Sequence, residues 1–205
     1  IRKLADKVRS FGVEKEEILS AMKSVAWGAR EAVRLGLTSF TWGNISVKVG
    51  GIVAITPSGV DMSNLKWSMV VLIDMSGNRL FGLLDPSSEY RMHLEIYKRR
   101  DVSAIIHVHP PFATAFAVAG KPIEPVLSEA DLFLGGEIRV ASYAPPGTEE
   151  LALKVAETLG SKKAVLMEKH GLVSVGNNIV EALQIALVVE ETARAQLLSR
   201  LVKEI

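Results

Sequence analysis

A predicted hairpin near the start of the chain restricts the folds that this sequence can adopt. Residues 45–49 alternate apolar and polar side chains, Gly50-Gly51 provides a turn, and residues 52–55 form a second apolar run. Two such runs joined by two glycines predict a pair of antiparallel strands. Helical tracts lie among further strand-type runs. We therefore expect an α/β protein whose sheet is mixed or antiparallel and covered by helices, rather than a doubly wound parallel sheet.

The spacing of apolar residues predicts the remaining elements. Helices are expected over about residues 1–12, 15–35, 87–100, 112–118, 149–159 and 179–202. Further strands are expected at residues 69–74, 104–106, 164–167 and 172–175. Thr148 and a serine of Ser87-Ser88 are predicted as helix N-caps, because a hydroxyl can accept a hydrogen bond from a free N–H of the first turn. Segment 126–143 has no regular pattern.

Composition narrows the classes of function. The chain of 205 residues is long enough for one domain with a substantial core, and we expect a single domain over residues 1–205. Lys and Arg number 24 against 23 Asp and Glu, so no basic surplus indicates a nucleic-acid partner. Neither a secretory signal nor a membrane-spanning apolar stretch is evident, which predicts a cytoplasmic protein without a membrane partner. With no cysteine, any metal must be held by imidazole and oxygen.

Three histidines stand at the ends of predicted strands. His107 and His109 end the apolar run 102–106 and precede Pro110-Pro111, and His170 follows the run 164–167. Residues two apart on a strand point to the same face, so His107 and His109 can approach one ion together. Three imidazoles in this setting suggest a zinc site with an open fourth position. The alternative is that they are structural histidines with ordinary hydrogen bonds.

Other polar residues could complete such a site. Glu89, at the start of a predicted helix, could be a fourth ligand or a general base, although a glutamate there is also favoured by the helix dipole. Segments 41–44, 56–59 and 87–88 are rich in hydroxyls, amides and glycine. Such groups can hold a phosphate, and they are equally common in ordinary turns.

Five motifs occur in an order that resembles the class II aldolase/adducin family. They are Gly43-Asn44-Ile45-Ser46, Ile55-Thr56-Pro57-Ser58-Gly59, Ser87-Ser88-Glu89, His107-Val108-His109 and Lys169-His170-Gly171. The family includes L-fuculose-1-phosphate aldolase, to which the motif pattern is most similar, and L-ribulose-5-phosphate 4-epimerase. The resemblance covers about residues 18–201. It implies a three-layer αβα fold with a central mixed, largely antiparallel sheet flanked by helices.

The resemblance also implies a site and a reaction. His107, His109 and His170 would bind one Zn²⁺ per subunit, and Glu89 would be the acid/base and a possible fourth ligand without substrate. The residues implied to bind the substrate phosphate are Gly43, Asn44, Ser58, Gly59, Ser87 and Ser88. The implied reaction cleaves a phosphorylated ketose like L-fuculose 1-phosphate into dihydroxyacetone phosphate and an aldehyde through a zinc-bound enediolate. The implied assembly is a homotetramer with active sites at subunit interfaces.

Some residues leave other activities open. No tyrosine clearly matches those that handle the aldehyde oxygen in the aldolase. Asp131 resembles an acid/base of the epimerase branch and is a possible second acid/base here, or an ordinary loop carboxylate. A 4-epimerase, a sugar-phosphate dehydratase and a decarboxylase are therefore alternatives, and an adducin-like interaction module is the non-enzymatic one. His93 is predicted to lie on a helix surface or at an interface, and Trp42 to pack under the phosphate loop.

Overall fold

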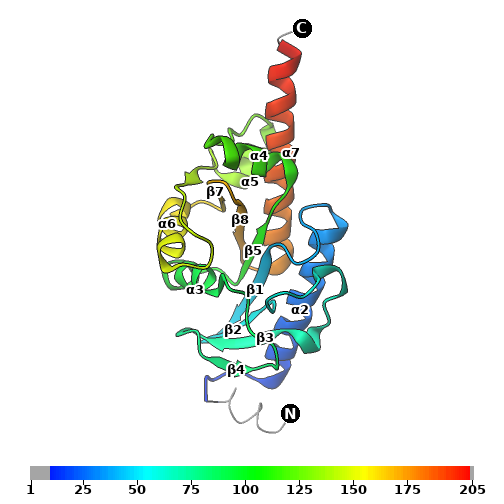
Figure 1. Cartoon of the computed structure of the whole chain (residues 1–205), viewed down its shortest axis with the longest axis vertical. Coiled ribbons are helices and arrows are strands. Elements are labelled where there is room, and N and C mark those ends of the chain that lie inside the picture. The colour runs from blue at the N-terminus through cyan, green and yellow to red at the C-terminus, as the bar shows by residue number, and fades with distance from the viewer. Residues whose placement is uncertain (1–9, 204–205) are drawn as a thin grey trace.

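A single sheet of eight strands forms the centre of the computed structural model, which describes residues 10–203 (Figure 1). The strands are β1 (Asn44–Val49), β2 (Ile52–Ile55), β3 (Val71–Asp74), β4 (Arg79–Phe81), β5 (Ala104–Val108), β6 (Val140–Ala141), β7 (Ala164–Met167) and β8 (Gly171–Gly176). Their order across the sheet is β4-β3-β2-β1-β5-β8-β7-β6. Among these pairs β6 and β7 are parallel and the others antiparallel, so the prediction of a mixed, largely antiparallel sheet is confirmed.

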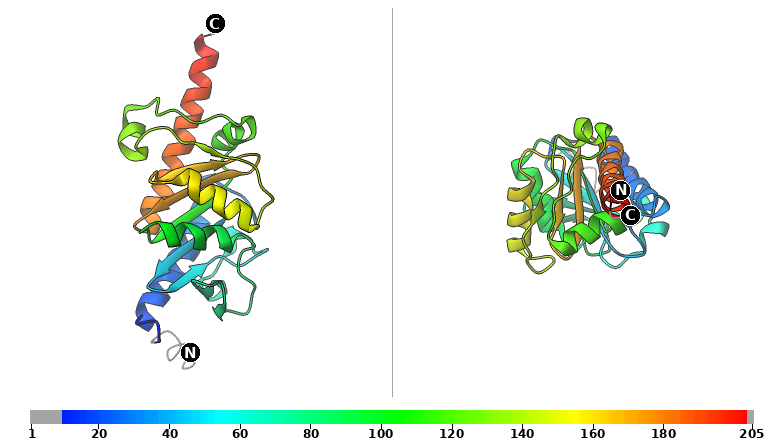
Figure 2. Two further views of the ribbon diagram at one scale, coloured as in Figure 1. Left: turned by 90° about the vertical axis from the view of Figure 1, so that its left-hand side faces the viewer. Right: turned by 90° about the horizontal axis from the view of Figure 1, so that it is seen from above.

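Helices cover both faces of the sheet, as Figure 2 shows from above. The α-helices are α2 (Lys15–Arg34), α3 (Tyr90–Arg99), α4 (Pro111–Ala119), α5 (Ser128–Leu134), α6 (Glu149–Leu159) and α7 (Ile179–Lys203). Two 3-10 turns, η1 (Met62–Asn64) and η2 (Trp67–Met69), lie between β2 and β3. Helices α2, α4, α5 and α7 pack in one apolar cluster, and α3 and α6 in another on the opposite face. The predicted three layers are thereby confirmed.

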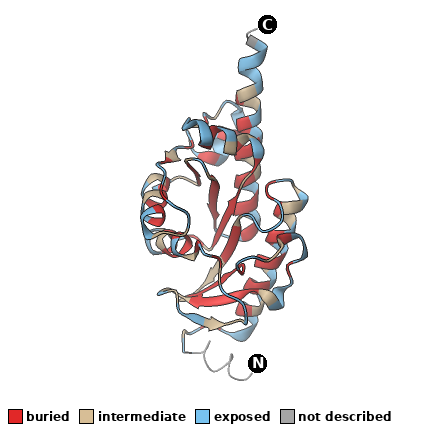
Figure 3. Ribbon diagram, in the orientation of Figure 1, coloured by how far each residue is buried: buried red, intermediate tan, exposed pale blue. Residues whose placement is uncertain are grey.

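Alternation along the strands explains the two clusters. In β5, Ala104, Ile106 and Val108 face the cluster of α2 and α7, while Ile105 faces the cluster of α3 and α6. Because successive strand side chains point to opposite faces, His107 shares the face of Ile105. Strands β2, β5, β7 and β8 are buried along their whole length, as the red strands in the centre of Figure 3 show, and they are therefore largely apolar.

Several boundaries differ from the predictions. The predicted strand at 69–74 begins only at Val71, because η2 occupies the preceding residues. The predicted helix at 87–100 begins at Tyr90, and its N-cap is Glu89 rather than a serine, so that prediction is wrong. Thr148 is confirmed as the N-cap of α6, since its hydroxyl accepts from the Leu151 N–H at 3.2 Å. Strand β4 was not predicted.

The two ends of the described chain are distinct. Residues 10–12 form a turn, and the rest of the helix predicted over residues 1–12 lies outside the described residues. At the other end, the last turns of α7 project beyond the body of the protein (Figure 1). No helix between residues 10 and 203 is both long enough and apolar enough to cross a membrane.

Candidate metal centre and active site

The structure brings the three predicted histidines together. His107 ends β5, His109 follows it, and His170 stands in the turn before β8. One ring nitrogen from each lies within 4.8 Å of the others, and Nε2 of His107 is 3.0 Å from Nε2 of His109. Strands β5 and β8 are antiparallel neighbours in the sheet, so His170, 61 or more residues after the other two histidines, lies where β5 ends and β8 begins. The cluster could hold a metal ion.

Hydrogen bonding orients the His107 ring. Its Nδ1 is 3.0 Å from the carbonyl oxygen of Leu172, and a carbonyl can only accept, so the proton must lie on Nδ1. Nε2 of the same ring faces His109 and Glu89. A backbone carbonyl that holds the second nitrogen of a ligand histidine is typical of metal sites.

The turn before β8 fits closely around the cluster. A Cβ on Gly171 would lie 2.5 Å from Cδ2 of His109 and 2.6 Å from the carbonyl oxygen of Val108, so that only glycine fits there. Lys169, next to His170, has a positive φ of 58°, a conformation that costs energy for a residue with a side chain. The close fit of Gly171 and the strained backbone of Lys169 thus hold the turn, and with it His170, in place.

Glu89 lies against this cluster. It is 6% exposed; its Oε2 is 3.2 Å from Nε2 of His107, and its Oε1 is 3.6 Å from Nε2 of His170. Oε2 accepts a hydrogen bond from Nδ2 of Asn44 at 2.8 Å. Oε1 is buried and has no hydrogen-bond partner in the described part of the chain. A buried oxygen without a partner is costly unless another group binds it.

The electrostatics of the site favour neutral side chains at His109 and His170 beside an ionised Glu89. Burial, followed by the nearby His107, lowers the pKa of His109 to about 3 and that of His170 to about 4. Burial alone would raise the pKa of Glu89. Attraction to His107 and His170, and hydrogen bonds with His107 and the Asn44 amide, outweigh burial and lower this pKa below its ordinary value. Neutral imidazoles offer lone pairs, and three nitrogens with one unpartnered carboxylate oxygen fit a divalent metal ion.

The loops predicted to hold a phosphate meet beside the site. The Ser87 N–H donates to the Thr56 carbonyl at 3.0 Å, and the Ser58 N–H donates to the Asp85 carbonyl at 2.9 Å. A bridge between Pro57 and Pro86 continues this pairing. Segments 56–59 and 85–88, which are separate in the sequence, therefore run alongside each other. Ser58, Gly59 and Ser88 are exposed there, whereas Ser87 is buried.

Gly43 connects the third predicted loop to the metal centre. Its φ is +85°, and a Cβ at this position would lie 2.4 Å from the carbonyl oxygen of His107. No other residue fits without moving the strand that carries the histidine. Asn44 follows in β1 directly opposite His107, and its buried side chain is bonded to Glu89 and His93.

Two further sequence predictions concern residues near this site. Trp42 is 62% exposed and its ring centroid is 5.9 Å from that of His109, so it borders the cluster rather than packing under the loop as predicted. Asp131 is exposed on α5. Within residues 10–203, no hydrogen bond or ion pair joins Asp131 to the histidines.

The prediction for His93 is wrong. His93 is fully buried, with Nε2 2.6 Å from Oδ1 of Asn44 and Nδ1 2.6 Å from Oγ of Ser46. Ser46 in turn is 2.8 Å from the Tyr97 hydroxyl. Sequence reasoning assigned no such role to His93, Ser46 or Tyr97, although a signal for it exists. Glu89, His93 and Tyr97 follow one another at intervals of four residues and so share one helix face. Asn44 and Ser46 are two residues apart and so share one strand face.

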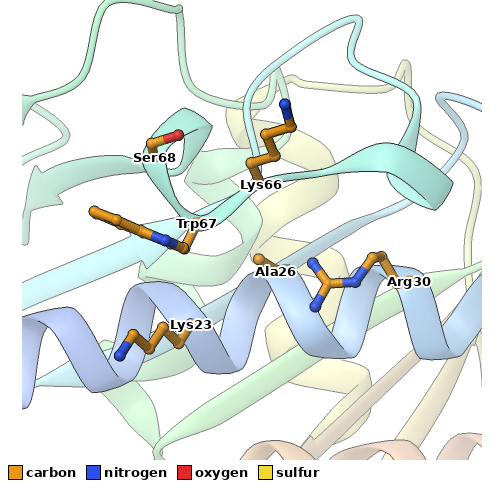
Figure 4. A pocket seen from close by; sticks show the side chains of 6 residues that line it. All are labelled: Lys23, Ala26, Arg30, Lys66, Trp67 and Ser68. Atoms are coloured by element: carbon orange, nitrogen blue, oxygen red, sulfur yellow. The ribbon is translucent and has the colours of Figure 1, made fainter.

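A hollow of about 270 Å³ lies elsewhere, between α2 and η2 (Figure 4). Its lining residues are Lys23, Ala26, Arg30, Lys66, Trp67 and Ser68. Arg30 donates to the carbonyl oxygen of Leu65 at 2.6 Å, which fixes one wall. None of the lining residues belongs to the histidine cluster or to the predicted phosphate loops, and we assign this hollow no part in the chemistry.

Comparison with known proteins identifies the family. A family model for the Class II Aldolase and Adducin N-terminal domain matches residues 23–197. A 5-methylthioribulose-1-phosphate/5-deoxyribulose-1-phosphate aldolase from Rhodospirillum rubrum is 38% identical over 166 residues, which cover 80% of this chain and 75% of the relative. A 5-deoxy-D-ribulose 1-phosphate aldolase from Bacillus thuringiensis serovar kurstaki is 38% identical over 184 residues, which cover 88% and 83%.

A solved structure agrees with these sequence matches. That of an L-fuculose 1-phosphate aldolase superposes with a TM-score of 0.85 at 36% identity, covering 88% of this chain and 86% of that one. The prediction of an aldolase rather than an interaction module is confirmed. The chain therefore belongs to the class II aldolase and adducin family, as one of its metal-dependent aldolases, which are carbon–carbon lyases.

Proposed function

We propose that this chain is a zinc-dependent aldolase that cleaves a ketose 1-phosphate into dihydroxyacetone phosphate and an aldehyde. The observation that carries the proposal is the buried Glu89, whose Oε1 has no partner among the described residues and lies beside the cluster of three histidines. His107, His109 and His170 would hold the zinc ion. When bound, zinc supplies a Lewis acid that stabilises negative charge developing on the substrate oxygens.

Glu89 acts as the acid/base. In the direction of synthesis its Oε1 takes a proton from the hydroxylated carbon of dihydroxyacetone phosphate, and in cleavage it returns a proton to that carbon. Oε2 stays with Asn44, so that the two oxygens of one carboxylate have separate roles. The lowered pKa of Glu89 keeps the carboxylate ionised at neutral pH, and the ionised form is the one that can accept a proton.

The paired loops bind the phosphate in this proposal. Support comes from the backbone pairing of segments 56–59 and 85–88, which gathers neutral hydroxyl and N–H donors beside Glu89. The residues assigned to the phosphate are Gly43, Asn44, Ser58, Gly59, Ser87 and Ser88. The names of the relatives support the position of the phosphate, because each acts on a ketose phosphorylated at carbon 1.

We also propose a cytoplasmic homotetramer that takes a phosphorylated sugar. The projecting end of α7 supports an assembly, since Leu198, Leu201 and Val202 are 43%, 52% and 69% exposed there. Exposed apolar residues gathered on one helix end are typical of interaction surfaces. Sedimentation equilibrium of the full chain tests the stoichiometry.

Proton exchange tests the reaction. The zinc-loaded protein is incubated with dihydroxyacetone phosphate in heavy water, without an aldehyde, and the hydroxymethyl proton signal is followed by NMR. We expect this signal to disappear faster than it does without the protein. Metal analysis of the same sample should give about one zinc ion per chain. A zinc-loaded protein that exchanges no proton would overturn the aldolase proposal and favour an epimerase or dehydratase, which need no such exchange.

A further inference from the structure

A line of buried polar side chains leads from Glu89 into the protein interior. Asn44 and Ser46 from β1 and His93 and Tyr97 from α3 are each at most 4% exposed. Consecutive polar atoms are 2.8 Å apart from the Tyr97 hydroxyl to Ser46, 2.6 Å from Ser46 to His93, 2.6 Å from His93 to Asn44 and 2.8 Å from Asn44 to Glu89. We call these four residues the buried relay.

The Asn44 amide sets the direction of every hydrogen bond in the buried relay. Its Nδ2 donates to Oε2 of Glu89, so its Oδ1 faces His93 and can only accept from that ring. His93 must then carry its proton on Nε2, which leaves Nδ1 to accept from the Ser46 hydroxyl. Ser46 has used its only proton and accepts from Tyr97. All donors therefore point from Tyr97 toward Glu89.

We propose that His93 is a positioning residue, which with Ser46 and Tyr97 locks the Asn44 amide so that Oε2 of Glu89 is held and Oε1 alone is free to exchange a proton with substrate. This inference rests on the proposed aldolase function. Without the N–H of His93 the amide can turn over and present Oδ1 to the carboxylate, which repels it. Glu89 then loses its fixed orientation, and a displaced reacting group slows the reaction more than it weakens substrate binding.

A purely structural role would not require this arrangement. The residues directly opposite Ser46 on the two neighbouring strands, Ile55 and Ile105, are apolar and belong to the cluster packed against α3 and α6. Apolar residues of similar volume would fill the same space without the cost of desolvating four polar groups. The buried relay instead ends on Glu89, the one carboxylate among the side chains that the structure describes with a buried oxygen that lacks a partner.

Variants at His93 separate positioning from folding. His93→Leu removes both ring nitrogens, whereas His93→Gln places an amide N–H where Nε2 was and can still donate to Asn44. We expect His93→Leu to lower kcat for exchange of the dihydroxyacetone phosphate proton by about 10²-fold, with KM changed by less than about 3-fold and the zinc content unchanged. The kcat of His93→Gln should be at least about 10-fold higher than that of His93→Leu.

Variants further along the buried relay provide a gradient. Ser46→Ala and Tyr97→Phe leave the His93 N–H in place, so we expect losses of about 5-fold and about 2-fold in kcat. All rates are expressed per folded, zinc-loaded chain, with folding checked by circular dichroism at the assay temperature. Equal kcat for wild type and His93→Leu, or no recovery in His93→Gln, would overturn the proposal.

A second measurement does not depend on activity. Nitrogen-15 NMR of the imidazoles reports which ring nitrogen carries the proton. It is recorded for the wild-type protein without zinc and with zinc bound. We expect His93 as the neutral Nε2–H form in both states, and an Nδ1–H form would reject the buried relay as drawn. If wild type exchanges no proton while His93 has the Nε2–H form, the proposed function fails and the relay is a structural network only.

Discussion

Two buried glutamates show how the same side chain can serve structure in one region and chemistry in another. Glu190 on α7 is 8% exposed and Glu89 is 6% exposed. Both oxygens of Glu190 are satisfied, because they accept from the N–H groups of Phe112 at 3.0 Å and Ala113 at 2.8 Å in the first turn of α4. Glu89 has one oxygen held by Asn44 and the other without a partner.

The difference lies in hydrogen-bond satisfaction rather than in burial. The first turn of a helix has free N–H groups, and Glu190 caps those of α4 from a distant part of the chain. A buried, unpartnered oxygen costs about 1–3 kcal/mol, so its presence in Glu89 indicates a group that binds a ligand or a proton. Burial, only partly offset by the two N–H groups, raises the pKa of Glu190, whereas the pKa of Glu89 is lowered.

The largest effect that we expect is on activity. Glu89→Gln should lower the rate of dihydroxyacetone phosphate proton exchange by about 10³-fold or more, since an amide cannot accept the proton. Glu190→Gln should leave the rate per folded chain within about 2-fold of wild type, because Glu190 bonds to the first turn of α4 and not to Glu89 or the three histidines. NMR exchange rates at matched zinc content provide the measurement. Similar losses in both variants would contradict the distinction between the two glutamates.

The same comparison shows what sequence reasoning can reach. Strand-end histidines and a preceding glutamate are local patterns, and the structure brings His107, His109, His170 and Glu89 together. The cap by Glu190 has no local signal, because its partners are 77 and 78 residues away along the chain. Such contacts depend on how α7 packs on α4, which periodicity cannot predict.

The errors in the fold have similar physical causes. Strand β4 has three residues, lies at the edge of the sheet and is partly exposed, so it lacks the buried alternation that marks a strand. Polar residues on a short helix usually face water, which is why His93 was assigned to a surface. Its true environment becomes clear only when β1 brings Asn44 and Ser46 against α3.

Metal binding should be the next largest effect. Zinc at about 10³ times its dissociation constant should stabilise the wild type by about 4 kcal/mol, since it binds the folded cluster. Thermal unfolding with zinc and with a chelator measures this gain. Glu190→Gln should keep the full gain, whereas His107→Ala should lose most of it because a ligand is missing. A zinc effect unchanged by His107→Ala would place the metal elsewhere.

Stability should separate the glutamates in the opposite sense. Glu190→Ala exposes two buried N–H groups without an acceptor, and we expect it to lower the free energy of unfolding by about 2 kcal/mol. Glu89→Gln in the metal-free protein removes a buried charge, and its loss should be smaller than that of Glu190→Ala. Urea denaturation of both variants with chelator present measures these changes. A larger loss in Glu89→Gln would make Glu89 chiefly structural.

The smallest effect is on the pH dependence of stability, where the two regions differ in sign. Burial lowers the pKa of His93 from 6.5 to about 3, so between these values the unfolded chain binds more protons and stability falls as pH falls. The raised pKa of Glu190 acts oppositely, because above 4.5 the folded chain holds more protons and this contribution is lost as pH rises. Each group changes the slope by at most about 1.4 kcal/mol per pH unit. Urea denaturation of metal-free protein between pH 5 and 6.5 should therefore give a flatter increase with pH in His93→Gln and a steeper one in Glu190→Gln. Slopes that change in the same direction in both variants would contradict the opposite pKa shifts of His93 and Glu190.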